Sequence, residues 1–306
     1  MNKLYDMIVI GGGPAGYTAA LYAARAGLST LVIEKMSVGG QMAVTDVIDN
    51  YPGFEQGVDG FTLGMKMQAG AERFGSETAY AEVRAVDLSA DPKIITTDMG
   101  EYEARTVVIA TGAGPKYLGM EGETEFLGRG VHYCAHCDGR FYKDKTVIVV
   151  GGGNSAAADA LYLAHLAKKV YVVHRRDTLR ATKVYHESLM RAENVEFLWN
   201  STVAGFYADE NGKRAKIVEV TSGEARMLAA DAVFVSIGRT PETVLFRNHL
   251  ILDAGGYIVA DETTKTNIDG VFAVGDVRTK ALRQVVTAVA DGAVAAHFAE
   301  EYLSSS

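Results

Sequence analysis

Two glycine-rich segments, each between an apolar run and a helix-compatible run, constrain the fold of this 306-residue chain most. The first, Gly11 to Gly16, follows the apolar run 5–10 and precedes the helix-compatible run 17–26. Glycines at this spacing allow a tight turn, the approach of a pyrophosphate to the backbone and close helix–strand packing. The next strand ends in Glu34, which would accept hydrogen bonds from an adenosine ribose. This context favours a dinucleotide-binding unit over a plain glycine-rich turn.

The second segment, Gly151 to Ala156, repeats this arrangement between a strand-like run and a helix-compatible run. Its second strand ends in His174, Arg175 and Arg176, with Arg180 one turn further, where an acid would be expected for NAD. Guanidinium groups bind a 2′-phosphate bidentately, whereas an acid would repel it. The alternative for these arginines is a solvated basic face. We expect the first copy to bind FAD and the second to bind NADPH.

Further apolar runs at 104–115 and 231–241 follow each copy and indicate an internal duplication, with boundaries near Pro115 and Pro241. The sequence therefore predicts an α/β fold with two Rossmann-like dinucleotide-binding units.

A last strand-like run ends in Gly275 and Asp276, which would place a carboxylate at the carboxyl edge of a sheet, where ligands bind in open α/β folds. An exposed turn aspartate is the alternative. The final segment, 282–303, begins with Arg283 and Gln284, and its apolar residues recur at helical spacing, which indicates core packing.

The composition limits the class of protein. With 33 glycines, 5 prolines and 48% hydrophobic residues, the chain is typical of a globular protein with many turns. A formal charge of −8 argues against bulk nucleic-acid binding. The N-terminal apolar run is strand-length, without a signal peptide, and no run is long enough to span a membrane. We expect a cytoplasmic protein without membrane or nucleic-acid partners.

The only two cysteines, Cys134 and Cys137, have two residues between them. This spacing can close a reversible disulfide and lower a thiol pKa, so it favours a redox pair. A structural disulfide is a weaker alternative, because closing so short a loop removes little unfolded-state entropy. The stronger alternative is zinc, since His132 and His136 alternate with the cysteines.

Taken together, the motifs make the chain resemble the low-molecular-weight bacterial thioredoxin reductases over nearly its whole length. The motifs that carry the resemblance are Gly11 to Gly16, Gly39-Gly40-Gln41, Asn50-Tyr51-Pro52-Gly53, Ala110-Thr111-Gly112, Cys134 to Gly139, Gly151 to Ala156, His174 to Ala181, Gly275-Asp276 and Arg283-Gln284. The family has Cys-Ala-Thr-Cys-Asp-Gly at its redox site, and this chain has His136 in place of the threonine. The substitution bears on rate and partner choice more than on the reaction.

The resemblance implies a homodimer that alternates between two domain arrangements, one for each electron-transfer step. It implies a discontinuous FAD-binding domain, 1–115 and 246–306, into which the NADPH-binding domain, 116–245, is inserted with the cysteine pair. Both domains would be of the three-layer FAD/NAD(P)-binding type.

The resemblance also implies roles for individual residues. Cys137 looks like the thiol next to the flavin, Cys134 like the thiol that attacks the substrate disulfide, and Asp138 like the acid that exchanges protons with them. An acid that favours a helix N-terminus is the alternative for Asp138. The candidate FAD-binding residues are Gly11, Gly13, Pro14, Ala15, Gly16, Glu34, Gly40, Gln41, Asn50, Thr111, Gly112, Asp276, Arg283 and Gln284. The candidate NADPH-binding residues are Gly151, Gly153, Asn154, Ser155, His174, Arg175, Arg176 and Arg180.

The leading hypothesis is an NADPH-dependent FAD disulfide reductase that acts on thioredoxin or a thioredoxin-like protein. A reductase of another small disulfide is the nearest alternative. A peroxiredoxin-reducing relative would carry an extra N-terminal domain, a ferredoxin-type NADP reductase would lack the cysteine pair, and a ferredoxin-fed reductase or dithiol oxidase would lack the arginines. A non-catalytic zinc module is a remote alternative, because His132, Cys134, His136 and Cys137 would crowd four ligands into six residues.

Overall fold

The computed structural model describes residues 3–45, 47–210 and 212–305, and the chain divides into two compact units. Unit 1 comprises residues 1–114 and 240–306, and unit 2 comprises residues 115–239. The second unit is therefore inserted into the first.

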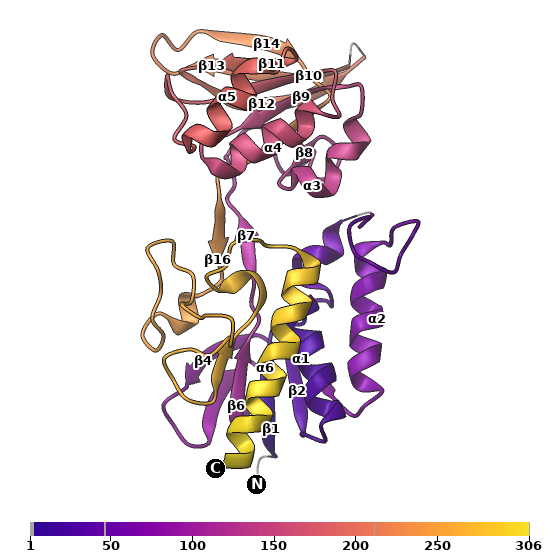
Figure 1. Ribbon diagram of the computed structural model, residues 1–306, viewed down its shortest axis with the longest axis vertical. Helices are drawn as coiled ribbons and strands as arrows, with labels where there is room; N and C mark the ends of the chain where they lie inside the picture. The colour runs from indigo at the N-terminus through magenta and orange to yellow at the C-terminus, as the bar shows by residue number, and fades with distance from the viewer. Residues whose placement is uncertain (1–2, 46, 211, 306) are drawn as a thin grey trace. The chain divides into compact units, whose positions relative to one another are not determined.

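In the described part of unit 1, seven strands form one sheet (Figure 1). They are β1 (Leu4–Ile10), β2 (Thr30–Glu34), β3 (Glu77–Tyr80), β4 (Val83–Asp87), β5 (Lys93–Thr97), β6 (Gly100–Ile109) and β17 (Val271–Ala273). The order β3-β2-β1-β6 is parallel, β17 pairs parallel with β6, and β5 and β4 continue antiparallel. The helices are α1 (Pro14–Arg25), α2 (Gly60–Glu72) and α6 (Val285–Ser305), and the 3-10 turns are η1 (Gly40–Val44), η3 (Val244–Phe246) and η4 (Gly275–Val277).

The sheet of unit 1 lies between two apolar cores because successive strand side chains point to opposite faces. On one face Met7 and Val9 pack with the alanine-rich sides of α1 and α6. On the other face Ile8 and Ile10 pack with residues that include Phe246 of η3. Helices α1 and α6 approach closely at Gly292, where a Cβ atom would overlap the backbone carbonyl of Ala15.

Unit 2 contains a parallel sheet of order β11-β10-β9-β15-β8. These strands are β8 (Val131–His132), β9 (Thr146–Val150), β10 (Lys169–Val173), β11 (Val195–Leu198) and β15 (Ala232–Val235). Its helices are α3 (Ala135–Asp138), α4 (Asn154–Ala164) and α5 (Lys183–Arg191), with the 3-10 turn η2 (Gly139–Tyr142). A separate antiparallel sheet consists of β12 (Ser201–Asp209), β13 (Gly212–Glu219) and β14 (Ala225–Ala229).

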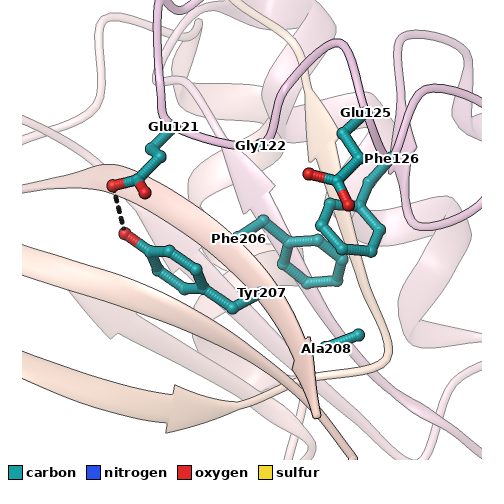
Figure 2. Close-up of a pocket in the computed structure, with 7 residues that line it drawn as sticks. All are labelled: Glu121, Gly122, Glu125, Phe126, Phe206, Tyr207 and Ala208. Carbon is teal, nitrogen blue, oxygen red and sulfur yellow. Dashed lines mark hydrogen bonds between the residues drawn. The ribbon is translucent and has the colours of Figure 1, made fainter.

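Unit 2 also has a small hollow, of about 140 Å³, beside β12 (Figure 2). The rings of Phe126 and Phe206 meet edge to face there at 5.3 Å, and the Tyr207 hydroxyl donates to Glu121 at 2.7 Å. None of the candidate site residues lines this hollow.

The chain passes between the units in β7 (Ala113–Pro115) and β16 (Arg239–Pro241), which pair in a two-stranded sheet. The predicted fold class, α/β with two parallel-sheet units and the second inserted into the first, is confirmed. The assignment of one cofactor to each unit remains a prediction. None of the helices in the described ranges combines the length and apolar character that a membrane crossing requires.

Candidate redox and dinucleotide sites

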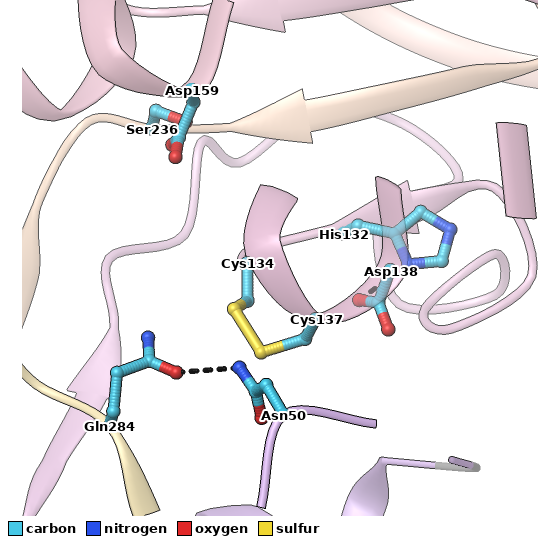
Figure 3. The surroundings of a disulfide bond; sticks show 8 residues. All are labelled: Asn50, His132, Cys134, Cys137, Asp138, Asp159, Ser236 and Gln284. Carbon is cyan, nitrogen blue, oxygen red and sulfur yellow. Dashed lines mark hydrogen bonds and ion pairs between the residues drawn. A yellow bond between two sulfur atoms is a disulfide. The ribbon is translucent and has the colours of Figure 1, made fainter. Parts of the chain in front are cut away.

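Cys134 and Cys137 form a disulfide, with Cα atoms 5.3 Å apart (Figure 3). Cys134 caps the short helix α3, and Cys137 lies within it. Both residues are half-buried, so the disulfide-bonded pair is only partly shielded. A disulfide between two cysteines this close in the sequence can break when the protein is reduced and form again when it is oxidised.

Asp138 follows Cys137 directly, and its carboxyl group contacts a buried histidine rather than solvent alone. The Nδ1 atom of His132 lies 3.0 Å from Asp138 Oδ2, and the Nε2 atom lies 2.7 Å from the hydroxyl of Tyr142 (Figure 3). His132 is 4% exposed, and Asp138 retains partial exposure. Burial is the main cause that raises the pKa of Tyr142 to about 12, and the negative charges of Asp138 and Asp231 add to it. The Tyr142 hydroxyl therefore stays protonated near neutral pH.

The zinc interpretation is not supported by these contacts. Both ring nitrogens of His132 are within hydrogen-bond distance of protein groups, and the two cysteines are joined to each other. His136 is exposed, and its ring lies 4.3 Å from that of Tyr162 in α4. Within the described ranges, no group of three or more His, Cys, Asp or Glu residues could hold a metal ion.

The first glycine-rich turn has a distinct local geometry at each glycine. Gly11 has a φ of +110°, and a Cβ atom there would lie 2.5 Å from the carbonyl oxygen of Ala110. A Cβ atom at Gly16 would overlap the carbonyl of Gly11. Gly13, which caps α1, faces open space, with no atom within 4 Å of its Cβ position. The turn therefore leaves room beside the N-terminus of α1, where an anionic pyrophosphate would fit.

Residues around this turn close it on several sides. Pro14 is the first residue of α1, where its missing N–H costs no helix hydrogen bond. Glu34 accepts a hydrogen bond from Gly12 N at 2.7 Å, so its carboxylate lies at the turn, where a ribose would follow a pyrophosphate. A Cβ atom on Gly40, in η1, would lie 3.5 Å from the Cα of Gly13, and the neighbouring Gln41 is exposed.

The remaining candidate FAD residues fall into two groups in unit 1. Asn50 Nδ2 donates to Gln284 Oε1 at 2.9 Å, although 234 positions separate the two residues (Figure 3). Thr111 Oγ1 donates to the carbonyl of Glu242 at 2.7 Å, and Gly112 has a φ of +74° with open space at its Cβ position. The fold thus joins segments from both parts of unit 1.

Asp276 lies in η4, directly after Gly275, whose Cβ position is 3.0 Å from the Cβ of Ala15 in α1. The guanidinium of Arg283 donates to the carbonyls of Asp276 and Arg278, at 3.4 and 3.2 Å, and stacks over the ring of Tyr257 at 4.0 Å. Arg283 therefore binds the backbone of the η4 turn.

The second glycine-rich turn repeats the first. A Cβ atom at Gly151 would overlap the carbonyl of Ser236, whereas Gly153, the N-cap of α4, faces open space. Asn154 Oδ1 accepts from Thr182 N at 2.8 Å, and Ser155 is exposed. Room for a pyrophosphate is again left beside a helix N-terminus.

His174 lies under this turn, where a Cβ atom on Gly152 would overlap its ring. It is 4% exposed, and its Nε2 atom has no hydrogen-bond partner in the structure. Burial is the main cause that lowers the pKa of His174 below its usual value of 6.5. The positive charges of Arg180, Arg176 and Arg175 lower it further. A neutral imidazole with a free nitrogen beside the turn is compatible with a bound nucleotide.

Arg175, Arg176 and Arg180 are exposed, and among the described residues none forms an ion pair with a carboxylate. The backbone N–H of Arg180 donates to Gly152 O at 2.7 Å, which fixes this arginine at the turn. Three free guanidinium groups beside this glycine-rich turn have the charge and donors that a 2′-phosphate would need.

Two supporting sets of residues were missed by sequence reasoning. Asp291, in α6, binds Arg278, Lys280 and the N–H of Gly275. Its position inside the apolar stripe of 282–303 was the available signal, because a charge there needs partners. His132 was considered only as a metal ligand, and its contact with Asp138 could not be read from spacing.

The sequence model of the family described as Pyridine nucleotide-disulphide oxidoreductase matches residues 5–292. The chain belongs to the pyridine nucleotide-disulphide oxidoreductase family. Its relatives include a thioredoxin reductase from Listeria monocytogenes, 47% identical over 305 residues, which span 99% of this chain and 95% of that protein. A thioredoxin reductase from Bacillus subtilis is 46% identical over 304 residues, 99% of this chain and 96% of that protein.

Solved structures agree with this assignment to the pyridine nucleotide-disulphide oxidoreductases. The crystal structure of thioredoxin reductase from Streptococcus pyogenes has a TM-score of 0.92 and 44% identity, and the alignment covers 100% of both chains. The chain is therefore an oxidoreductase, and membership of the family together with these relatives implies the use of a flavin and a pyridine nucleotide.

Proposed function

We propose that this protein is an NADPH-dependent, FAD-containing disulfide reductase whose substrate is thioredoxin or a thioredoxin-like protein. The observation that carries the proposal is the Cys134–Cys137 disulfide, in a chain that is similar to thioredoxin reductases over 99% of its length. The proposal is supported by the two glycine-rich turns, which leave open space at Gly13 and Gly153, with a carboxylate at the first turn and guanidinium groups at the second.

FAD would be held in unit 1 by the open turn at Gly13, by the Glu34 carboxylate and by the η4 turn at Asp276. NADPH would be held in unit 2 by the turn at Gly153 and by the three arginines. The bound flavin would supply two-electron transfer between the reduced nicotinamide and the disulfide.

The cysteines then perform the exchange. Reduction breaks the Cys134–Cys137 bond and adds two electrons and two protons, which gives two thiols. Cys134 gives its proton to the Asp138 carboxylate and attacks one sulfur of the substrate disulfide, and the other substrate sulfur leaves as a thiolate that takes this proton from Asp138. Cys137 then attacks Cys134, the mixed disulfide breaks, the proton of Cys137 passes to the released substrate sulfur, and the Cys134–Cys137 disulfide is restored. These separate roles of the two thiols rest on the family resemblance.

The protein is further proposed to act in the cytoplasm as a homodimer, as the resemblance to the low-molecular-weight enzymes implies. Light scattering of the purified protein tests the second point: a mass near that of one 306-residue chain would contradict it.

The central experiment uses purified holoprotein, which should be yellow. NADPH should reduce its flavin much faster than NADH does, and electrons should then reach thioredoxin. Cys134→Ser and Cys137→Ser should abolish thioredoxin reduction but leave flavin reduction by NADPH intact. A panel of thioredoxins, glutaredoxins and small disulfides identifies the substrate. If no member of the thioredoxin group is reduced while a small disulfide is, the proposed substrate is wrong.

A further inference from the structure

His132 occupies a rigid, buried position next to the redox pair. It pairs with Phe234 between strands β8 and β15, and its ring stacks on the Phe234 ring at 5.2 Å with an interplanar angle of 25°. The Tyr142 ring packs against it edge to face at 5.1 Å. Because the ring is held on its face and at its edge, its two nitrogens point at fixed partners.

The hydrogen bonds of His132 define one consistent arrangement of protons. Tyr142 keeps its proton near neutral pH, so its hydroxyl can donate to Nε2. The other nitrogen then carries the hydrogen, and Nδ1–H donates to the carboxylate of Asp138. In this tautomer the imidazole presents its Nδ1–H as a donor to Asp138.

The titratable groups around this ring come from three elements. Asp138 faces it from α3 and Tyr142 from η2, and Asp231, which precedes β15, acts on Tyr142 through its charge. The Asp231 carboxylate also accepts a hydrogen bond from Thr146 N at 2.9 Å. Tyr142 is the donor on one side of His132, and Asp138 is the acceptor on the other.

We propose that His132 is a positioning residue for Asp138 in the exchange reaction, held in the required tautomer by Tyr142. The inference rests on the proposed function, in which the Asp138 carboxylate takes the proton of Cys134 and passes it to the leaving thiolate. One carboxylate oxygen, Oδ2, is bound to His132, which leaves the other oxygen, Oδ1, available for proton exchange.

The role of His132 is greatest when Asp138 has given up its proton. In that step an O–H bond of Asp138 breaks, an S–H bond forms on the leaving thiolate, and the electron pair stays on the carboxylate. Donation from Nδ1–H stabilises the negative carboxylate, because hydrogen bonds to a charged group favour the charged form. No bond to His132 forms or breaks. Without this donor the Asp138 carboxylate loses its fixed orientation, and protonation removes it from the reaction at a higher pH than in the parent.

Substitutions of His132 test its contact with Asp138 and its contact with Tyr142 separately. In His132→Asn the side-chain amide can occupy the place of Nδ1 and donate to Asp138. In His132→Gln the amide reaches the place of Nε2, on the Tyr142 side. His132→Leu removes both contacts and keeps an apolar side chain against Phe234. The matched control is His165→Leu, a change to an exposed histidine in the same unit.

The measurement is thioredoxin reduction by the holoenzyme as a function of pH, with flavin reduction by NADPH measured in parallel. We expect His132→Leu and His132→Gln to lower turnover about tenfold and to move the acid limb of the pH profile to higher pH. His132→Asn should keep both near those of the parent. Flavin reduction should be unchanged in all variants, because it does not require the disulfide.

The outcomes separate this inference from the proposed function. If the parent protein reduces no thioredoxin, the proposed function fails. If the parent is active and Asp138→Asn is impaired, but the Asn and Gln variants at position 132 share one pH profile, His132 does not act on Asp138. A uniform loss of rate without movement of the acid limb likewise overturns the inference, because a packing defect alone predicts that result.

Discussion

Asp291 and Arg278 form a buried, two-pronged ion pair behind the η4 turn: Nε and one terminal nitrogen of the arginine each lie 3.0 Å from a carboxylate oxygen. Lys280 donates to the same carboxylate at 2.8 Å, as does the backbone N–H of Gly275. A charge in the middle of an apolar helix is thus fully partnered. The pair connects α6 to the turn that carries Asp276.

The first prediction concerns this ion pair. Burial alone would raise the pKa of Asp291, but hydrogen bonds from Arg278 and Lys280 outweigh it and hold the pKa below its usual value. A lowered carboxyl pKa stabilises the fold above the unfolded value, and this stabilisation is lost as the pH falls through the folded value. Asp291→Asn leaves two cations without their partner, and we expect it to lower the free energy of unfolding by about 3 kcal/mol.

Urea unfolding measured by circular dichroism tests this, with the exposed Glu300→Gln on the same helix as control. The deficit of Asp291→Asn relative to the parent should shrink as the pH is lowered below about 4, the ordinary pKa of an aspartate carboxyl group. A deficit that is independent of pH would contradict the assigned role of the charge.

The second prediction compares two glycines of the first turn. Gly13→Ala adds a methyl group in open space, so the apoprotein should unfold at the same temperature as the parent. The same methyl group would occupy the room left for a pyrophosphate, so the flavin content should fall. Gly16→Ala adds one against the Gly11 carbonyl, so the fold itself should be destabilised. The flavin-to-protein ratio and the apoprotein melting temperature distinguish the two. Gly70→Ala, which also meets no atom within 4 Å, is the control. Full flavin content in Gly13→Ala would argue against cofactor binding at this turn.

The third prediction concerns the exposed arginines of unit 2. Replacing Arg175 or Arg180 with Gln removes a charged donor, so the KM for NADPH should rise about tenfold or more for each change. The KM for NADH should hardly move, because NADH has no 2′-phosphate. Arg191→Gln, which alters an exposed arginine paired with Glu187, provides the control. An equal increase for both nucleotides would indicate that these arginines do not bind the 2′-phosphate.

The fourth prediction follows from the lowered pKa of His174. The unfolded chain takes up a proton near the ordinary histidine pKa of 6.5, while the folded protein keeps this ring neutral to lower pH. The neutral ring therefore contributes its full stability above the ordinary pKa of 6.5, and the fold loses stability as the pH falls below that value. Between about pH 7.5 and about pH 5.5, the parent should lose more stability than His174→Gln. Urea midpoints at both pH values measure this, with His165→Gln as control. Equal losses in the parent and in His174→Gln would show that the ring titrates alike in both states.

The glycine-rich turns show how much local sequence can predict. Gly11 has a positive φ and Gly16 approaches the Gly11 carbonyl closely, as their spacing indicated, because these features arise within one turn between a strand and a helix; only the approach of Ala110 to Gly11 depends on strand pairing. The cysteine spacing likewise predicted a closable pair, and the two cysteines do form a disulfide. The two-unit α/β fold followed from the repetition of these local signals, whereas the binding roles of individual residues remain predictions.

Contacts between distant segments required the tertiary structure. The Asn50–Gln284 hydrogen bond joins residues 234 positions apart, and the partners of Asp291 lie on a turn that precedes its helix. His132 shows the same limit over a short distance: it is six residues from Asp138, but the contact depends on how β8 pairs with β15 and where α3 begins. The sequence by itself determined the local turns, the strand–helix order and the redox pair, because each depends on adjacent residues. The tertiary structure decided which side chains support them, because burial and hydrogen-bond partners are set by the packing of elements far apart in the chain.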